Sequence, residues 1–474
     1  MSRHERLGGP VAAHGRRAGI WFDPLPWIVS LATIVWTLTW WRQHPCQQVS
    51  VDDAPDPFLR LCYSDIPVTY QGSRLWEGAR VYSQVTDLEY PVLTGGFMTL
   101  ARTITGWFGL PIKPELPLAR VLASANAFFA VNAVLLFACL LLLVGCQMLM
   151  GRGSATGVAD TIRGRVRSWD AMFVVTAPTL FTAGLVSWDL FGVALTSLAL
   201  LLWALRRPTA AGVVLGLAVS ARFYPLLVLL AVGMLCARAG THKAMARFAV
   251  ATLGTWAVVN IPVIALAPQG WFAYYKAWYR RGADMGSVWY LFDQWGLPAV
   301  TSSVPLLTLV TVMAMLVWTA AVAQLVVRAP RRPRVAQVVL LLVVGFLVLN
   351  KVYAPQYALW LLPLVALARP KVLDMAVWSL AEALHWWAVW GHLGGQIAPG
   401  DGGPEVVYWA AIVLRVGAQL WIAQRVIHDI RHPWDDPVRV PFVDDPIGGV
   451  LDHAPDAGMV DDAREPISLM SDDD

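Results

Sequence analysis

Long apolar runs separated by short polar or charged stretches dominate the chain. A helix of about 20 apolar residues is long enough to cross a hydrocarbon core of about 30 Å. The pattern therefore predicts an all-α, polytopic membrane protein. The apolar runs that we expect to cross the membrane fall near residues 25–41, 121–150, 170–186, 188–205, 247–268, 301–327, 335–350, 357–368, 372–392 and 405–424.

The stretch 209–237 is also apolar, but it is too short for two full crossings. Basic residues flank both of its ends, so both ends are expected on the same side of the membrane. Because Pro225 disfavours helix at the residue before it, we expect a short hairpin that is broken at 221–225. Counting this hairpin as two gives a bundle of about 12 transmembrane helices. The Gly- and Thr-rich run from Val92 to Gly109 is expected to form an interfacial or re-entrant helix.

Composition strengthens this picture. The 474 residues are 57% hydrophobic and only 14% charged, whereas soluble domains carry about a quarter charged residues. A water-soluble enzyme is therefore excluded. The net charge of +4 hides a strong asymmetry, because residues 429–474 hold 13 acidic and three basic side chains. The remaining positive charge sits between the apolar runs, where it sets topology, and it does not indicate nucleic-acid binding.

The distribution of basic residues predicts a multi-pass plasma-membrane protein with both termini in the cytoplasm. Residues 1–24 would form a cytoplasmic amino-terminal segment, and residues 25–428 the membrane core. The loops 42–90 and 269–300 would lie outside and, with interfacial helices, cap the bundle there. Residues 429–474 are rich in Asp and Pro and poor in apolar residues, so we expect a disordered cytoplasmic tail.

Asp65 is the first candidate for chemistry. It lies in the first outside loop among aromatic and apolar residues, where a carboxylate can act as a general base on a hydroxyl group. The alternative is a structural role. The pair Ser64 and Asp65 precedes Ile66 and Pro67, and such a sequence would also suit the capped start of a helix.

Several basic residues are candidates for binding an anion at membrane depth or at the outer surface. Arg222 lies at the break of the short hairpin, where a guanidinium suits a phosphate or carboxylate; the alternative is a structural ion pair with Asp189. Arg280 and Arg281 follow an aromatic run that we expect to be an interfacial helix. They would hold a lipid phosphate or contact anionic headgroups without specificity.

A polar segment at 350–357 separates two apolar runs that are short for membrane crossings. Polar backbone at such a place is tolerated where it lines a protein-walled cavity, although a plain outside turn is the alternative. The side chains expected to face the cavity are Lys351, Tyr353, Gln356 and Tyr357. His385 is a further cavity candidate; it shares a helix face with Glu382, and a hydrogen bond between helices is the alternative.

Cys46 and Cys62 lie in the same outside loop, where they would form a disulfide in an oxidising compartment or remain free thiols. The sequence contains neither a phosphate-binding glycine loop nor a cluster of residues with zinc-ligand spacing, so no cofactor and no metal is expected. An enzyme that faces outward without a nucleotide must use a donor available there. A lipid-linked donor meets that requirement.

Three motifs carry a resemblance to a known family. They are the first-loop pattern Asp65, Val68-Thr69-Tyr70, Gly72, Gly78 to Tyr82 and Tyr90-Pro91; the Gly-rich helix Ala211 to Leu217 followed by Arg222 and Pro225; and Asn350 to Tyr353 with Pro355 to Tyr357 and Trp360 to Pro363. Together they resemble the actinobacterial polyprenyl-phosphate-mannose-dependent transferases of glycosyltransferase family 87, which belong to the GT-C superfamily.

The resemblance implies an inverting transfer of a sugar, mannose in these relatives, on the outer face of the membrane. The acceptor would be a glycolipid or a cell-wall glycan. Asp65 would be the general base, and Glu89 and Tyr90 would shape the acceptor side. The donor phosphate would be held by Arg222 and Lys351, together with Arg280 and Arg281. The alternative function is a transporter or flippase of lipid-linked sugars, which broken helices also permit.

Overall fold

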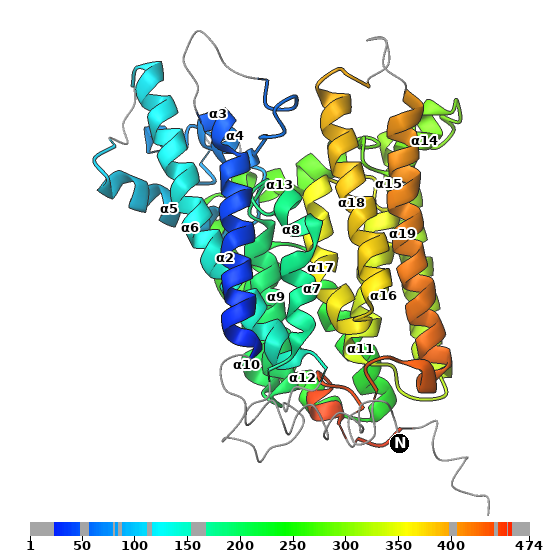
Figure 1. Ribbon diagram of the computed structural model, residues 1–474. Coiled ribbons are helices and arrows are strands. Elements are labelled where there is room, and N and C mark those ends of the chain that lie inside the picture. The colour runs from blue at the N-terminus through cyan, green and yellow to red at the C-terminus, as the bar shows by residue number, and fades with distance from the viewer. Residues whose placement is uncertain are drawn as a thin grey trace, which may run out of the picture.

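The computed structural model describes residues 23–47, 56–78, 81–83, 88–110, 116–152, 167–397, 405–439, 444–452 and 454–456. Within these ranges all regular structure is helical, as the hydropathy pattern predicts. The longer helices run side by side as a bundle (Figure 1). They are α2 (Pro24–Arg42), α6 (Leu118–Met150), α9 (Asp189–Ala204), α10 (Pro208–Ala221), α11 (Leu226–Ala239), α12 (His242–Leu266), α15 (Val304–Arg328), α16 (Val335–Leu349), α17 (Ala358–Ala368), α18 (Val372–Leu393) and α19 (Glu405–Arg431).

Shorter elements complete the bundle. Figure 1 shows α3, α4 and α14 at one end of it, so that parts of both large loops share this end. Among the residues that the structure describes, four helices are long and apolar enough to cross a membrane by length and composition alone, namely α6, α12, α15 and α19. The number of about 12 crossings therefore stays a prediction. The shorter helices are α3 (His44–Gln47), α4 (Asp65–Gly72), α5 (Val92–Trp107), α7 (Met172–Thr176), α8 (Pro178–Ala183), α13 (Pro268–Arg280) and α14 (Val288–Gln294).

The hairpin expected at 209–237 is present as α10 and α11, which are separated at 222–225. Helix α10 packs very closely on α12 because it presents glycines at the contact. A Cβ atom at Gly212 would lie 2.4 Å from the carbonyl oxygen of Phe248, and one at Gly216 would lie 2.5 Å from that of Thr252. Small residues allow helix backbones to approach in this way. The close contact fixes the end of α10, where Arg222 follows.

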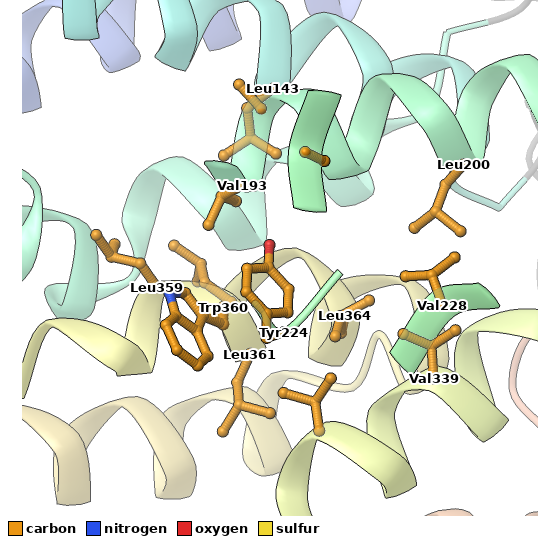
Figure 2. Close-up of a cluster of buried hydrophobic side chains, with 14 of the residues drawn as sticks. Leu143, Val193, Leu200, Tyr224, Val228, Val339, Leu359, Trp360, Leu361 and Leu364 are labelled. Carbon is orange, nitrogen blue, oxygen red and sulfur yellow. The ribbon is translucent and has the colours of Figure 1, made fainter. Parts of the chain in front are cut away.

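The centre of the bundle is formed by helices that are apolar on all sides. Every residue of α17 is buried, and so are nearly all residues of α16. A helix of this kind must be surrounded by other helices. Figure 2 shows part of this core, in which the ring of Tyr224 stacks on Trp360 with ring centroids 4.5 Å apart. In contrast, α12 and α15 are mostly exposed and apolar, as expected of helices that face lipid.

The carboxyl-terminal segment corrects the expectation of a disordered tail from residue 429. Helix α19 continues to Arg431, and residues 433–439 and 444–456, apart from the undescribed position 453, pack against the end of the bundle opposite α4. Asp436 forms a buried ion pair with Arg334 at 2.8 Å, and Asp456 pairs with Arg238 at 2.7 Å. The acidic composition predicted disorder, but arginines at the ends of the helices pair with these carboxylates. Residues 457–474 and 1–22 lie outside the described part of the chain.

Candidate active site

Asp65 is the first residue of α4, and the residue before it caps this helix. The hydroxyl of Ser64 accepts a hydrogen bond from the backbone N–H of Ile66 at 3.2 Å and donates to the carbonyl of Leu185 at 2.7 Å. The backbone N–H of Asp65 donates to the carbonyl of Val186 at 2.7 Å. These contacts anchor the start of α4 beside the turn that precedes α9. The capping role belongs to Ser64, and the Asp65 side chain is available for other contacts.

The Asp65 carboxylate is contacted by side chains from distant parts of the chain. The Tyr90 hydroxyl donates to Oδ2 at 3.3 Å, and Nε2 of Gln356 donates to the same oxygen at 3.4 Å. Gln356 lies in the 3-10 turn Pro355–Tyr357, and Tyr90 lies just before α5. Three segments that are remote in sequence therefore meet at one carboxylate.

These residues line a polar cavity of about 140 Å³. Seven residues singled out in the sequence line it together, which are Asp65, Glu89, Tyr90, Arg222, Arg281, Gln356 and Tyr357. The other lining residues are Tyr274, Ala277, Trp278, Val352 and Ala354. The cavity therefore combines two carboxylates, two guanidinium groups and a wall of aromatic rings.

Arg222 forms the structural ion pair that was the alternative to anion binding. Its Nη2 donates to Oδ2 of Asp189 at 3.0 Å, and both side chains are buried. Asp189 also accepts a hydrogen bond from the indole of Trp360 at 2.7 Å. Arg222 nevertheless lines the cavity, and its guanidinium carbon lies 5.1 Å from the centre of the Tyr90 ring. It therefore contributes positive charge from a fixed position.

Arg281 and Glu89 form a second, much more exposed ion pair. Their closest atoms are 3.3 Å apart, and about half of each side chain is exposed. The pair joins the end of α13 to the segment before α5, and both residues line the cavity. Arg280 is exposed and does not line the cavity. Of the adjacent arginines, only Arg281 is thus brought to Asp65.

Burial raises the pKa of the Asp65 carboxyl group to about 6. A hydrogen bond from Tyr63 lowers this pKa, the negative charge of Asp189 raises it, and Arg222 and the hydrogen bond from Tyr90 lower it. Burial has the largest effect on this pKa, because removal from water disfavours the charged form. A carboxylate with such a pKa is ionised near neutral pH and is a stronger base than an exposed aspartate.

Three residues expected in the cavity lie elsewhere. Nζ of Lys351 donates to the Tyr279 carbonyl at 2.9 Å and to the Thr308 hydroxyl at 2.6 Å. The Tyr353 hydroxyl accepts a hydrogen bond from Gln419. His385 is fully buried on α18. None of the three lines the cavity.

The backbone explains why Lys351 and Tyr353 point away. It is extended at Asn350 and at Ala354, and successive side chains of an extended chain point to opposite sides. Val352 and Ala354 line the cavity, so the side chains of Lys351 and Tyr353, which alternate with them, point to the opposite side. The following 3-10 turn then returns Gln356 and Tyr357 to the cavity.

Two groups of contributing residues were not anticipated from the sequence. Tyr274 and Trp278 line the cavity with Arg281, and their spacing of four and three residues places them on one face of α13 and its end. That spacing was a usable signal. Arg415 is buried on α19, pairs with Glu382 at 2.9 Å, and donates to the carbonyls of Tyr353 and Ala354 at 3.3 Å. An arginine within an apolar run is costly to bury, and this position in the sequence was therefore a usable signal.

A second cavity, of about 240 Å³, adjoins the polar one and shares Tyr90 and Tyr274 with it. It is lined largely by apolar and aromatic side chains from α10, α11, α12 and α13 and from the residues between α10 and α11. They include Val219, Phe223, Leu226, Leu253, Trp256 and Trp271. The two cavities thus place a charged compartment beside an apolar one.

A disulfide joins Cys46 to Cys62. Cys46 belongs to α3, which follows α2, and Cys62 lies three residues before Asp65. The bond therefore ties the segment that leads into α4 to the end of a bundle helix. It restricts the part of the first loop that presents the Asp65 carboxylate.

The chain is similar to a known family of glycosyltransferases. The model of glycosyltransferase family 87 matches residues 107–350, just over half of the chain. A crystal structure of ArnT from Cupriavidus metallidurans bound to undecaprenyl phosphate is similar, with 13% sequence identity and a TM-score of 0.42, over 86% of this chain and 77% of that chain. No curated protein matches the chain.

Proposed function

The chain belongs to glycosyltransferase family 87, and we propose that it transfers mannose from a polyprenyl-phosphate donor to a lipid-linked or cell-envelope glycan acceptor on the outer face of the membrane. The observation that carries the proposal is the meeting of Asp65, Arg222 and Arg281 in one cavity beside an apolar cavity. This arrangement suits a donor that has a sugar, a charged phosphate and a long apolar chain.

In the proposed reaction Asp65 acts as the general base. The acceptor hydroxyl gives its proton to the Asp65 carboxylate while its oxygen bonds to the anomeric carbon of the donor sugar. The bond from that carbon to the phosphate oxygen breaks, and its electron pair leaves with polyprenyl phosphate. The attack comes from the face opposite the leaving group, so the configuration at the anomeric carbon is inverted. The raised pKa of Asp65 makes its carboxylate a better proton acceptor.

The leaving phosphate gains negative charge and needs fixed positive charge nearby. Arg222 supplies such a charge, although Asp189 already neutralises part of it. Arg281 is better suited to contact the phosphate directly, because its partner Glu89 is half exposed and such pairs are weak. We therefore propose that Arg281 contacts the phosphate directly and that Arg222 stabilises its negative charge without direct contact. Lys351 and Arg280 are not assigned a role because neither lines the cavity.

The apolar cavity supports a place for the first isoprene units of the donor. It begins where the polar cavity ends, at Tyr90 and Tyr274, and is lined by Phe223 and Leu226. Burial of apolar chain against such side chains is favourable by about 25 cal/mol per Å². The donor would then be held with its phosphate at the junction of the two cavities and its sugar beside Asp65.

The proposal is tested by incubating the purified protein with a series of polyprenyl-phosphate sugars and with glycolipids extracted from membranes as acceptors. The products are then analysed by mass spectrometry. We expect a new mannosylated product with the wild-type protein and none with Asp65→Asn. The matched control is Asp293→Asn, which removes an acidic side chain on α14 outside the cavity. Full transfer by Asp65→Asn would refute the role of Asp65. Transfer only from a donor with another sugar would show that mannose is not the transferred sugar.

A further inference from the structure

We infer that Tyr90 and Gln356 are positioning residues that hold the Asp65 carboxylate in the orientation in which it receives the acceptor proton. The inference rests on the proposed function, since it presumes that Asp65 is the base. Both residues donate to the same oxygen, Oδ2 of Asp65, from different segments. A carboxylate with one oxygen bound by two donors cannot rotate freely.

The two distances, 3.3 and 3.4 Å, are longer than those of typical protein hydrogen bonds. Catalytic hydrogen bonds often tighten only when substrate is bound. Both donors are neutral, so they orient the carboxylate without the strong acidification that a contacting cation would cause. Asp65 thereby stays basic enough to take a proton.

Tyr90 is itself held firmly. The Tyr82 hydroxyl lies against the carbonyls of Tyr90 and Pro91, at 2.9 and 2.7 Å. Tyr82 in turn fits between two glycines. A Cβ atom at Gly95 would lie 2.3 Å from the hydroxyl oxygen of Tyr82, and a Cβ atom at Gly270 would lie 2.2 Å from the backbone carbonyl oxygen of Tyr82. Tyr90 is thus held by Tyr82, which is packed between α5 and α13.

Gln356 is held by a separate brace. Arg415 of α19 donates to the carbonyls of Tyr353 and Ala354, directly before the 3-10 turn that carries Gln356. The same guanidinium pairs with Glu382 of α18, and both side chains are fully buried. A buried charge paired in this way holds a defined geometry, because leaving either partner alone would be costly. The brace explains a buried ion pair that lies outside the cavity.

The first test measures the protonation of Asp65 without any substrate. Dicyclohexylcarbodiimide modifies protonated carboxyl groups in apolar surroundings, and mass spectrometry of the Asp65 peptide gives the extent of modification at each pH. Removing a donor to the charged form raises the pKa of an acid. Tyr90→Phe and Gln356→Met should therefore each move the midpoint of modification upward by about one pH unit.

Gln356→Glu sharpens this test. It keeps the size of the side chain and replaces the donor by a second carboxyl group at 3.4 Å from Oδ2. Two carboxylates at such a distance repel each other, so the upward shift should exceed that of Gln356→Met. The matched control is Tyr357→Phe. Tyr357 lines the same cavity and stacks on Trp360 without a hydrogen bond to Asp65, so its variant should leave the midpoint unchanged.

The variants leave the other ionisable groups around the carboxylate in place. The groups around the Asp65 carboxylate are Tyr63, Asp189 of α9, Arg222 after α10, and Glu89 and Arg281, which line the same cavity. The second test is the pH profile of kcat/KM with polyprenyl-phosphate mannose, whose acidic limb should move with the modification midpoint in each variant. A merely structural role would lower the rate without moving that limb.

The outcomes separate the inference from the proposed function. Unchanged midpoints in Tyr90→Phe, Gln356→Met and Gln356→Glu would overturn the inference, whatever the rates. Transfer that survives Asp65→Asn would overturn the proposed function instead. Midpoints that shift in these three variants and not in Tyr357→Phe, together with an inactive Asp65→Asn, would support both.

Discussion

Arg222 lies in a buried ion pair with Asp189, in which Nη2 donates to Oδ2 at 3.0 Å and Nε lies 2.9 Å from Oδ1. The pair joins the residue that follows α10 to the first residue of α9, and its Arg222 lines the same cavity as Asp65. Gly192, one turn along α9, makes room for it, because a Cβ atom there would lie 2.9 Å from Cγ of Arg222. The position of this guanidinium is therefore fixed by α9.

Breaking this pair should destabilise the protein. Asp189→Asn leaves a buried guanidinium without a counter-charge, which costs about 3–5 kcal/mol. We expect a clear fall in the melting temperature of the detergent-solubilised protein, together with a loss of transfer. Thermal unfolding monitored by intrinsic tryptophan fluorescence measures the first effect.

The double variant Arg222→Met with Asp189→Leu separates stability from function. Replacing both members of a buried pair by apolar residues of similar size is often neutral for stability. The double variant should therefore melt at a higher temperature than Asp189→Asn, although the Trp360 indole loses its acceptor, and it should still fail to transfer sugar. Wild-type transfer by this variant would show that Arg222 has a structural role only.

The pKa of Asp65 predicts a pH dependence of transfer. A general base must be unprotonated, and burial raises the pKa of Asp65 to about 6, so the protonated, inactive form increases as the pH falls through this value. We expect kcat/KM to fall about tenfold per pH unit below about pH 6 and to be level above it. Initial rates at low donor concentration between about pH 5 and about pH 8 measure this. A flat profile over that range would contradict the role of Asp65.

The disulfide between Cys46 and Cys62 should support both stability and activity. A bridge that closes a loop of about 15 residues stabilises by about 3 kcal/mol in the chain-entropy view, and here the separation is 16 residues. Cys46→Ser with Cys62→Ser should lower the melting temperature and reduce kcat, because the segment leading into Asp65 is then less restricted. Cys236→Ser, which removes a free buried thiol on α11, is the control for substitution of a cysteine. Equal kcat in the double variant would contradict a positioning role of the bridge.

The helices could largely be predicted from the sequence, since hydropathy and proline report directly on burial and on helix breaks. The run expected at 335–350 is α16, Val335–Leu349, and the break expected at 221–225 lies between α10 and α11. The packed part of the carboxyl-terminal segment could not be predicted, because its aspartates are neutralised by arginines from distant helices. Composition counts charges and does not report which of them pair.

The site was predictable in its members and less so in its geometry. Asp65, Arg222 and Gln356 were recognisable as polar residues in places where polar groups are costly. Whether Lys351 or Val352 faces the cavity depends on the phase of an extended segment, and a shift of one residue reverses every side chain in it. The pairing of Arg222 with Asp189 was one of two open alternatives, and only the relative position of α9 and α10 decides between them.

Substitution of Lys351 tests whether this side chain holds the donor phosphate, as expected from the sequence, or only supports the structure. Its amine donates to the Tyr279 carbonyl and the Thr308 hydroxyl, which joins the segment after α16 to α13 and α15. Lys351→Met should therefore lower the melting temperature, because two partly buried hydrogen bonds are lost, at up to about 1–3 kcal/mol each. The KM for the polyprenyl-phosphate donor should stay at its wild-type value. A raised KM with unchanged stability would assign Lys351 to the donor phosphate after all.

Arg281 should determine the affinity for the donor phosphate, and its neighbour supplies the control. Hydrogen bonds to charged groups contribute about 1.5–3 kcal/mol, so Arg281→Gln should raise the donor KM by at least about tenfold. Glu89→Gln removes the competing carboxylate that pairs with Arg281 and should lower this KM. Arg280→Gln removes the same charge from the adjacent residue, which does not line the cavity, and should leave the KM unchanged. Equal KM values for the Arg280 and Arg281 variants would mean that the phosphate responds only to the overall positive charge of this loop.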